Sequence, residues 1–296
     1  MNIKPWIQAA RLRTLPLAFS CIITGAAIAI QNNVFNPIIF ILALLTTLLL
    51  QVLSNYANDY GDAVSGKDKD RVGEKRMVAS GEIAKEAMKK SIYLFSFLSF
   101  ISGLLLIIYC FNNYFYIILF IVLGLAAIWA AIKYTVGKNP YGYSGYGDLF
   151  VFLFFGIVGV VGSSILYTTD LDYIILLPAF SIGLLSTAVL TLNNLRDIEN
   201  DAKTAKNTLI VKMGFAKGKS YFASLILLSQ LAMIAYAILS HFENRQYLFL
   251  LASILLSGIL KKVLNTNKPE QMDPFLKQTA IATFTFSLLF LLAMLY

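Results

Sequence analysis

Long apolar stretches dominate the chain, and their number and length constrain its fold more than any other feature. Of its 296 residues, 58% are hydrophobic and only 14% are charged, which is outside the range of soluble globular domains. A helix needs about 20 apolar residues to cross a bilayer. Stretches near that length lie at 15–31, 37–57, 92–110, 114–132, 149–168, 173–193, 221–240, 246–260 and 278–296. The sequence therefore predicts an all-α, polytopic membrane protein with nine transmembrane helices.

Basic residues orient these helices, because Lys and Arg concentrate in cytoplasmic loops. With the N-terminus inside, 23 of the 24 Lys and Arg residues fall on the inner side, and only Arg245 lies outside. The net charge of +8 then reflects topology and attraction of anionic substrates or lipid headgroups, and no nucleic-acid partner is needed to explain it. We predict a multi-pass protein of the cytoplasmic (inner) membrane, with the N-terminus and the longest loops cytoplasmic.

The basic N-terminus before an apolar stretch also fits a secretory signal peptide, with residues 27–29 as a cleavage site. Cleavage there would leave eight helices that start outside, which inverts the charge bias, so a retained first helix is favoured. No polar segment is long enough for a soluble domain, and one membrane domain over 1–296 is the simplest organisation. The two longest inner connections, 58–90 and 194–220, follow helices two and six, and this spacing of four helices suggests a duplicated half.

Asn and Asp residues cluster where helices two and six end. The first cluster holds Asn55, Asn58, Asp59 and Asp62, and the second holds Asn193, Asp197 and Asp201. An ionised Asp at the centre of a membrane helix costs roughly 2.5–3.5 kcal/mol on insertion scales, so such groups at a membrane boundary indicate a functional site. Residues four apart share a helix face, which gives each cluster a stripe of oxygen atoms on one side.

Two such stripes on the same side of the membrane predict a metal site. Neighbouring carboxylates repel each other unless a cation lies between them. Mg²⁺ prefers hard oxygen ligands and usually takes one or two carboxylates, with the remaining ligands from water and substrate phosphate. The pattern therefore predicts both Mg²⁺ and a phosphate-bearing substrate. Capping of a helix end would explain one Asn or Asp, but not two stripes.

Cations near the two clusters suggest a site that ionises a diphosphate, since metal and basic groups together neutralise charge on such a leaving group. The candidates are Arg71, Arg76, Lys133, Arg196, Lys206 and Lys212. Arg binds a diphosphate bidentately and Lys as a point charge, although any single loop cation is more often a topology determinant. The aromatic loop 133–148 adds Tyr134 and Tyr141, whose rings can stabilise a cation or orient an aromatic substrate; an interfacial aromatic belt explains each of them equally well.

These residues resemble the UbiA superfamily of intramembrane aromatic prenyltransferases. Its first signature, N-D-x-x-D-x-x-x-D, is matched by Asn58-Asp59-Tyr60-Gly61-Asp62, and its second, D-x-x-x-D, by Asp197 to Asp201. Further matches at 13–16, 140–143, 147–152 and 207–209 make the chain most similar to the 1,4-dihydroxy-2-naphthoate polyprenyltransferases of menaquinone biosynthesis. Two positions depart from the pattern: Gly66 stands where the last Asp of the first signature is expected, with Asp68 close by, and Ala205 replaces a Gly before Lys206.

The resemblance implies a nine-helix bundle with a central active-site cavity, capped by the cytoplasmic loops and open sideways to membrane lipid. It implies that Asn58, Asp62, Asp197 and Asp201 hold Mg²⁺ on a polyprenyl diphosphate, with catalytic roles for Asp62, Asp197, Asp201 and Arg196. Substrate contacts would come from Asn55, Asp59, Arg71, Arg76, Lys133, Tyr134, Tyr141, Asn193 and Lys206, with Arg13 on the acceptor carboxylate. Ionisation gives an allylic cation, which the ring of 1,4-dihydroxy-2-naphthoate attacks at the carbon bearing the carboxylate. Loss of carbon dioxide and a proton yields demethylmenaquinone.

Several alternatives stay open at this stage. Another branch of the superfamily would prenylate 4-hydroxybenzoate, homogentisate or haem, and the pocket shape that decides the acceptor is not visible in a sequence. An ion-coupled transporter also carries membrane carboxylates, but here they lie at one face in metal-type spacing. A soluble-type prenyl diphosphate synthase would not need nine spans, and the longer signature of CDP-alcohol phosphotransferases is absent from the sequence.

Overall fold

The computed structural model describes residues 3–66 and 75–295, and in these ranges every regular element is helical. The first half contains α1 (Lys4–Ala10), η1 (Leu12–Thr14), α2 (Leu15–Gln31), α3 (Pro37–Ser65), α4 (Lys85–Cys110), α5 (Tyr114–Lys133), η2 (Tyr141–Tyr143), α6 (Gly147–Val151), η3 (Phe152–Val161) and α7 (Gly162–Ile165). The second half contains η4 (Tyr173–Ile175), α8 (Leu176–Arg196), α9 (Ile198–Lys203), α10 (Leu209–Met213), α11 (Phe215–Leu239), η5 (Asn244–Phe249), α12 (Leu250–Asn265), η6 (Pro269–Met272) and α13 (Asp273–Ala293).

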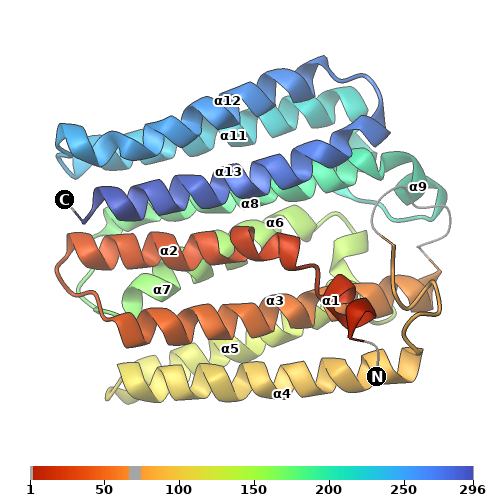
Figure 1. Ribbon diagram of the computed structural model, residues 1–296, viewed down its shortest axis with the longest axis horizontal. Coiled ribbons are helices and arrows are strands. Elements are labelled where there is room, and N and C mark those ends of the chain that lie inside the picture. The colour runs from red at the N-terminus through yellow and green to blue at the C-terminus, as the bar shows by residue number, and fades with distance from the viewer. Residues whose placement is uncertain (1–2, 67–74, 296) are drawn as a thin grey trace.

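Nine helical segments of the described chain are long and apolar enough to cross a membrane, which confirms the predicted all-α architecture. The long helices lie side by side, and the two chain termini lie at opposite ends of the bundle, as an odd number of spans requires (Figure 1). The short helices α1 and α9 lie at the N-terminal end of the bundle (Figure 1). Both Asp clusters are at this end, since α3 and α8 finish there.

Several helices extend beyond the apolar stretches that predict them. Helix α3 continues to Ser65, eight residues past the predicted end, and α13 begins at Asp273, before the predicted start at 278. Apolar length marks only the part of a helix within the hydrocarbon, while backbone hydrogen bonds continue into the interface. The first Asp cluster is therefore helical throughout, whereas Asp197 separates α8 from α9 with φ −92° and ψ 6°.

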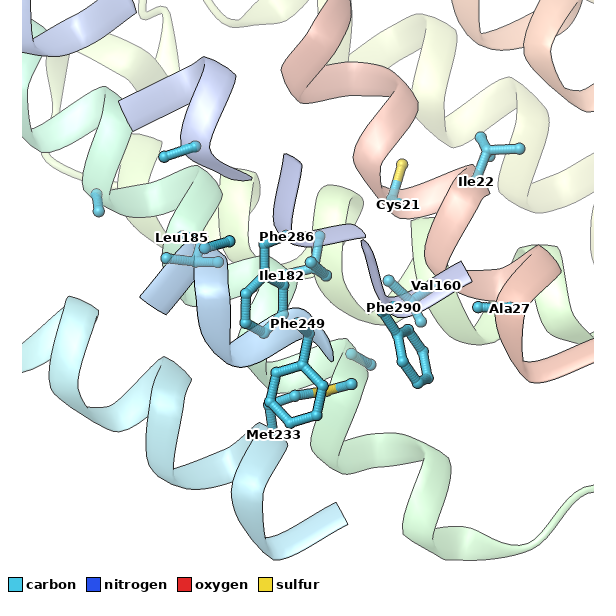
Figure 2. Close-up of a cluster of buried hydrophobic side chains, with 14 of the residues drawn as sticks. Cys21, Ile22, Ala27, Val160, Ile182, Leu185, Met233, Phe249, Phe286 and Phe290 are labelled. Atoms are coloured by element: carbon cyan, nitrogen blue, oxygen red, sulfur yellow. The ribbon is translucent and has the colours of Figure 1, made fainter. Parts of the chain in front are cut away.

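Two groups of buried side chains hold the bundle together. The larger joins α2, η3, α8, α11, α12 and α13, and aromatic residues such as Phe249, Phe286 and Phe290 fill its centre (Figure 2). The smaller joins α1, α3, α4 and the turn after residue 76, around Leu53 and Met88. Helices α3 and α4 contribute residues to both groups, and α2 packs directly against α3.

The fifth span departs from a regular α-helix, which its apolar sequence did not predict. Its central part, η3, is a π-helix of 10 residues, a wider form that is common at functional sites. It packs against α8 at two glycines, where a Cβ on Gly156 would lie 2.7 Å from the Ala179 carbonyl oxygen and 2.9 Å from Gly183 Cα. The absence of side chains at both positions is what lets the two backbones approach this closely.

We expect Gly156→Ala to destabilise the bundle, because the added methyl meets backbone atoms that cannot move without separating η3 from α8. A loss of about 1–3 kcal/mol is typical of such overpacking. Gly162→Ala on the same span is the matched control, since its Cβ would come no closer than 4.0 Å to another residue. Thermal unfolding of both purified variants followed by tryptophan fluorescence checks the expectation; equal midpoints would contradict it.

Candidate active site

A cavity of about 470 Å³ lies between the helices and reaches the end of the bundle where the Asp clusters lie. Polar residues line its inner end, and apolar residues such as Leu17, Leu106 and Phe154 line the rest. Helices α2, α3, α4, α5, η3, α8 and α13 all contribute side chains. Of the predicted site residues, the cavity is lined by Arg13, Asn55, Asn58, Asp62, Arg76, Tyr134, Tyr141, Asn193 and Lys206.

Asp62 is the best-anchored carboxylate of the first cluster. Its side chain is buried and forms an ion pair with Arg76, whose NH2 group donates to Oδ2. The Tyr143 hydroxyl donates to the other oxygen, Oδ1, at 2.5 Å. A hydrogen bond of this length to a carboxylate belongs to the strong, charge-assisted class. Two elements distant in sequence therefore orient Asp62 at the cavity wall.

The neighbouring polar groups of α3 hold other segments in place. Asp59 accepts the backbone N–H groups of Met77 and Val78 at 3.0 and 2.9 Å, so it anchors the turn that carries Arg76. Asn55 donates to the Ala10 carbonyl oxygen at 2.8 Å and to the Thr14 hydroxyl at 3.1 Å. The structure thus gives Asp59 a role in loop anchoring, and it does not place it among the cavity-lining residues described.

Asn58 faces the end of α5. Its Oδ1 accepts the Thr135 hydroxyl at 3.1 Å, and the same hydroxyl is 3.0 Å from the Ala57 carbonyl oxygen. Thr135 also explains Gly61 of the first signature, because a Cβ at Gly61 would lie 2.7 Å from the Thr135 carbonyl oxygen. Only glycine permits this close approach of α3 to the segment after α5.

The second cluster centres on an ion pair between adjacent residues. Arg196 donates to both oxygens of Asp197, at 2.7 Å from Nε and 2.8 Å from NH2. NH1 donates to Asp273 at 2.7 Å, and NH2 also donates to Asn193 Oδ1 at 2.9 Å. The Arg196 side chain is only 1% exposed and is not among the described cavity-lining residues. In the structure its guanidinium is held by Asp197, Asp273 and Asn193, which suits it to orient Asp197; its role at the diphosphate stays a prediction.

Asp201 lies one turn further along and pairs with Lys206, whose Nζ is 3.3 Å from Oδ1. The Lys206 backbone N–H also donates to the Asp201 carbonyl oxygen at 2.8 Å, which returns the chain to the end of α9. This tight reversal places Ala205 at φ 52°. The left-handed region favours glycine, which accounts physically for the glycine that the family pattern expects there.

Aromatic rings form a continuous ladder along one side of the cavity. Trp129, Tyr141, Phe150 and Phe154 stack in sequence, with ring centroids 6.3, 4.0 and 6.2 Å apart. Tyr134 meets Tyr141 edge to face at 5.4 Å. Burial raises the pKa of Tyr134 and of Tyr141 well above the ordinary tyrosine value, and the nearby charge of Asp148 adds to the effect for Tyr134. Both phenols therefore stay protonated at any working pH.

Two predicted cations are placed differently from the rest. Lys133 is exposed at the end of α5, and it is not among the described residues of the cavity wall. Arg71 lies outside the described residues. Sequence reasoning missed Tyr143, Thr135 and Asp273, which act through other site residues. It also assigned Lys277 to topology alone, although this residue lines the cavity.

Both Asp clusters contribute to the cavity wall, with Asn58 and Asp62 from the first and Asn193 from the second, whereas Asp197 and Asp201 are not among the described cavity-lining residues. The charges of Asp62 and Asp201 both contribute to the raised pKa of the Tyr134 phenol. Within the described residues no three acidic, His or Cys side chains gather tightly enough to hold a metal by themselves. This donor set fits Mg²⁺ that shares its ligands with water and phosphate, and it does not fit an all-protein metal cage.

Comparison with known proteins identifies the family of this chain. The sequence profile described as the UbiA prenyltransferase family matches residues 18–294. The chain belongs to this family. A 1,4-dihydroxy-2-naphthoate octaprenyltransferase from Haemophilus influenzae is 43% identical, over 99% of this chain and 96% of that protein. The enzyme of the same name from Escherichia coli is 42% identical, over 98% and 94%. Membership of the UbiA family sets aside the transporter and the other enzyme classes considered above.

Solved UbiA structures share the fold at low sequence identity. An apo UbiA homolog from Aeropyrum pernix superimposes with a TM-score of 0.68 at 13% identity, over 91% of this chain and 94% of that one. A UbiA homolog from Archaeoglobus fulgidus bound to GPP and Mg²⁺ gives 0.61 at 15% identity, over 95% and 99%. The helical architecture of the family thus accounts for nearly the whole chain.

The strained residue Ala205 leads to a testable expectation. Ala205→Gly removes the steric cost of φ 52°, about 1 kcal/mol or slightly more, and part of this gain is offset because glycine makes the unfolded chain more flexible. Ala205→Val at the same φ is more strained than alanine, because β-branched residues are genuine outliers there. In detergent, the inactivation temperature of Ala205→Gly should therefore equal or exceed that of the natural protein. The inactivation temperature of Ala205→Val should be lower. A Val variant as stable as the natural protein would refute this.

Proposed function

We propose that this protein transfers a polyprenyl chain from a polyprenyl diphosphate to 1,4-dihydroxy-2-naphthoate, releasing diphosphate and carbon dioxide and giving demethylmenaquinol, the reduced form of demethylmenaquinone, since no oxidation accompanies the transfer. The observation that carries the proposal is the mixed lining of the cavity, which joins the first Asp cluster, Asn193 of the second cluster and several cations to a long apolar wall with aromatic rings. A diphosphate with a long apolar chain matches both parts of this lining. Relatives of that name at 42–43% identity over nearly the whole chain support the acceptor.

At the polar end, the side chains are suited to binding the diphosphate. Asn58, Asp62, Asp197 and Asp201 would hold Mg²⁺, which supplies charge neutralisation to the departing diphosphate when bound. Arg76 and Lys206 line the cavity and are already oriented by Asp62 and Asp201. Both can bind diphosphate oxygens directly. Arg196 contributes by holding Asp197 in place.

Beside the polar groups, the aromatic ladder serves the reacting carbon. Breaking the C–O bond to diphosphate leaves an allylic cation, which the faces of Tyr141, Phe150 and Phe154 can stabilise by cation–π attraction. All three line the cavity. Because the phenols there remain protonated, Tyr141 offers its ring face and no competing nucleophile. The ring carbon of the acceptor then attacks, and the electron pair of its bond to the departing carbon dioxide restores aromaticity.

The acceptor carboxylate needs a cation away from the diphosphate. Arg13 on η1 and Lys277 on α13 both line the cavity, and η1 contacts α13. Asn55 and Gln51 both donate to the Thr14 hydroxyl, at 3.1 and 3.0 Å. These hydrogen bonds fix η1, which carries Arg13. We assign the carboxylate to this pair of cations.

The polyprenyl tail is longer than the cavity. Pockets of 300–1,000 Å³ enclose drug-sized ligands, so 470 Å³ holds the reacting head and a few isoprene units only. The wall between α5 and η3 offers the exit: α5 packs mainly on α3 and α4, whereas η3 packs mainly on α8 and α2. The aromatic ladder bridges these two helices at the cytoplasmic end, and the tail would pass into lipid below it. The distribution of Lys and Arg supports a location in the inner membrane with these loops on the cytoplasmic side.

Prenyl transfer by the lipid-reconstituted protein tests the function. With 1,4-dihydroxy-2-naphthoate and octaprenyl diphosphate we expect Mg²⁺-dependent demethylmenaquinol, and a loss of at least about 100-fold in kcat for Asp197→Ala, since an oriented charge in the site disappears. Asp170→Ala, in an exposed outer loop, should retain full activity. Product with 4-hydroxybenzoate alone would keep the mechanism and change the acceptor. Product without metal would contradict the assigned site.

The exit route has its own test at Gly124 on α5, which lines the cavity and has no atom within 4 Å of a built Cβ. Gly124→Trp should fold and obstruct the exit. We expect kcat/KM for octaprenyl diphosphate to fall roughly tenfold or more, the size of effect that steric changes in an apolar pocket give, with a much smaller loss for geranyl diphosphate.

Gly258→Trp is the matched control, because Gly258 is exposed on α12 and is equally uncrowded. It should leave the kinetics with both donors unchanged. An equal loss with long and short donors in Gly124→Trp would place the tail elsewhere.

A further inference from the structure

Tyr143 connects the two Asp clusters, although neither signature includes it. Its hydroxyl donates to Asp62 Oδ1 at 2.5 Å, and Ser65 Oγ, one turn beyond Asp62 on α3, lies 3.3 Å from the same hydroxyl. The Tyr143 side chain therefore contacts the first cluster at two successive positions of the α3 terminus. The residue is 8% exposed and is not among the cavity-lining residues described.

The other contacts of Tyr143 belong to the second cluster. Its carbonyl oxygen accepts the Asn207 backbone N–H at 2.9 Å. Its ring lies under Lys206, with Nζ 5.8 Å from the ring centroid, within the range of a cation–π contact. Lys206 in turn pairs with Asp201. One side chain thus joins a carboxylate of α3 to the cation that holds a carboxylate of α9.

The loop around Tyr143 is fixed independently on both sides. On one side, Tyr141 donates from its hydroxyl to the Ala130 carbonyl oxygen at 2.7 Å, and the Gly142 N–H donates to the Tyr134 carbonyl oxygen at 3.1 Å. On the other side, Lys212 Nζ donates to the Ser144 carbonyl oxygen at 3.1 Å. Since the backbone is anchored before and after it, Tyr143 cannot follow Asp62 if α3 moves, and it can therefore set the position of that carboxylate.

We propose that Tyr143 is a positioning residue that fixes Asp62 relative to Asp201 and Lys206, and thereby sets the affinity of the site for a divalent cation with diphosphate. The inference rests on the proposed function, which supplies the ligand of the site. A carboxylate oxygen has more than one acceptor position, so Oδ1 can receive the Tyr143 hydroxyl and still bind a cation. Partners of metal ligands that act in this way typically change metal affinity or activity 10- to 100-fold.

The position of Tyr143 argues against a direct catalytic role. Its hydroxyl is engaged by a carboxylate, and its ring is covered by Lys206 and the α3 terminus. We therefore expect its loss to change the metal requirement and leave the KM for the acceptor unaltered. A residue that only stabilised the fold would lower the amount of active protein and would not shift the metal concentration for half-maximal activity.

The test is binding of Mn²⁺ in the presence of inorganic diphosphate, followed by electron paramagnetic resonance on the full-length protein in lipid nanodiscs. Tyr143→Phe keeps the ring and the backbone contact and removes only the hydroxyl. We expect it to weaken Mn²⁺ binding by about tenfold or more, with a parallel rise in the Mg²⁺ needed for half-maximal prenyl transfer. Tyr143→Leu also loses the contact with Lys206 and should weaken binding further.

Tyr146→Phe is the matched control, an exposed tyrosine of the same loop, and should bind Mn²⁺ as the natural protein does. A double mutant adds a second readout that does not require full activity. If Tyr143 acts through Asp62, Tyr143→Phe should weaken Mn²⁺ binding little further in an Asp62→Asn background. Additive losses in the double mutant, or natural affinity in Tyr143→Phe, would overturn the inference. Absence of Mn²⁺–diphosphate binding by the natural protein would instead overturn the proposed function, and this inference with it.

Discussion

Charge compensation of buried carboxylates at one end of an apolar bundle is the constraint on which the rest of the structure depends. Asp62, Asp197 and Asp201 are each only 3–4% exposed, and desolvation of an ion at such a site costs several kcal/mol unless partners and hydrogen bonds replace the water. Each of the three has a cationic partner: Arg76, Arg196 and Lys206. Arg76 and Lys206 lie beyond the ends of α3 and α9, so the segments that carry them must fold back onto these helix ends.

The same need for charge compensation explains why residues that only hold other groups in place matter to the site. Asp59 is almost fully buried, at 1% exposed, and holds the turn that delivers Arg76 to Asp62. Asp273 comes from the start of the last membrane span, 76 positions after Asp197 in the printed chain, and holds the guanidinium that orients Asp197. Removing one partner of a buried ionic pair leaves an uncompensated charge, which is far more costly than never having had the pair. Each of these contacts is therefore needed to hold the next side chain in its position.

Features that follow from local chemistry could be predicted from the sequence, and features that follow from long-range packing could not. Apolar length and the Lys and Arg bias gave the nine spans, and the helical spacing of Asn58 with Asp62 gave the first polar face. Nothing in the sequence distinguishes Tyr143 from Tyr141 two positions earlier, because their roles depend on which neighbour the folded loop brings to each hydroxyl. The contact of Arg196 with Asp273 could not be predicted for the same reason, because Asp273 lies on another span.

The π-helical stretch and the aromatic ladder line the part of the cavity beside the charged groups with apolar and aromatic side chains. A π-helix has a wider backbone than an α-helix, and η3 places Phe154, Phe155 and Val158 along the cavity wall while its glycine remains in contact with α8. Stacked rings from Trp129 to Phe154 then cover the side toward α5. An electrostatic interaction is worth more in such a water-excluded site than in solvent. A diphosphate held at the boundary would thus leave toward the charged groups, while the cation it leaves behind stays among aromatic faces where water is scarce.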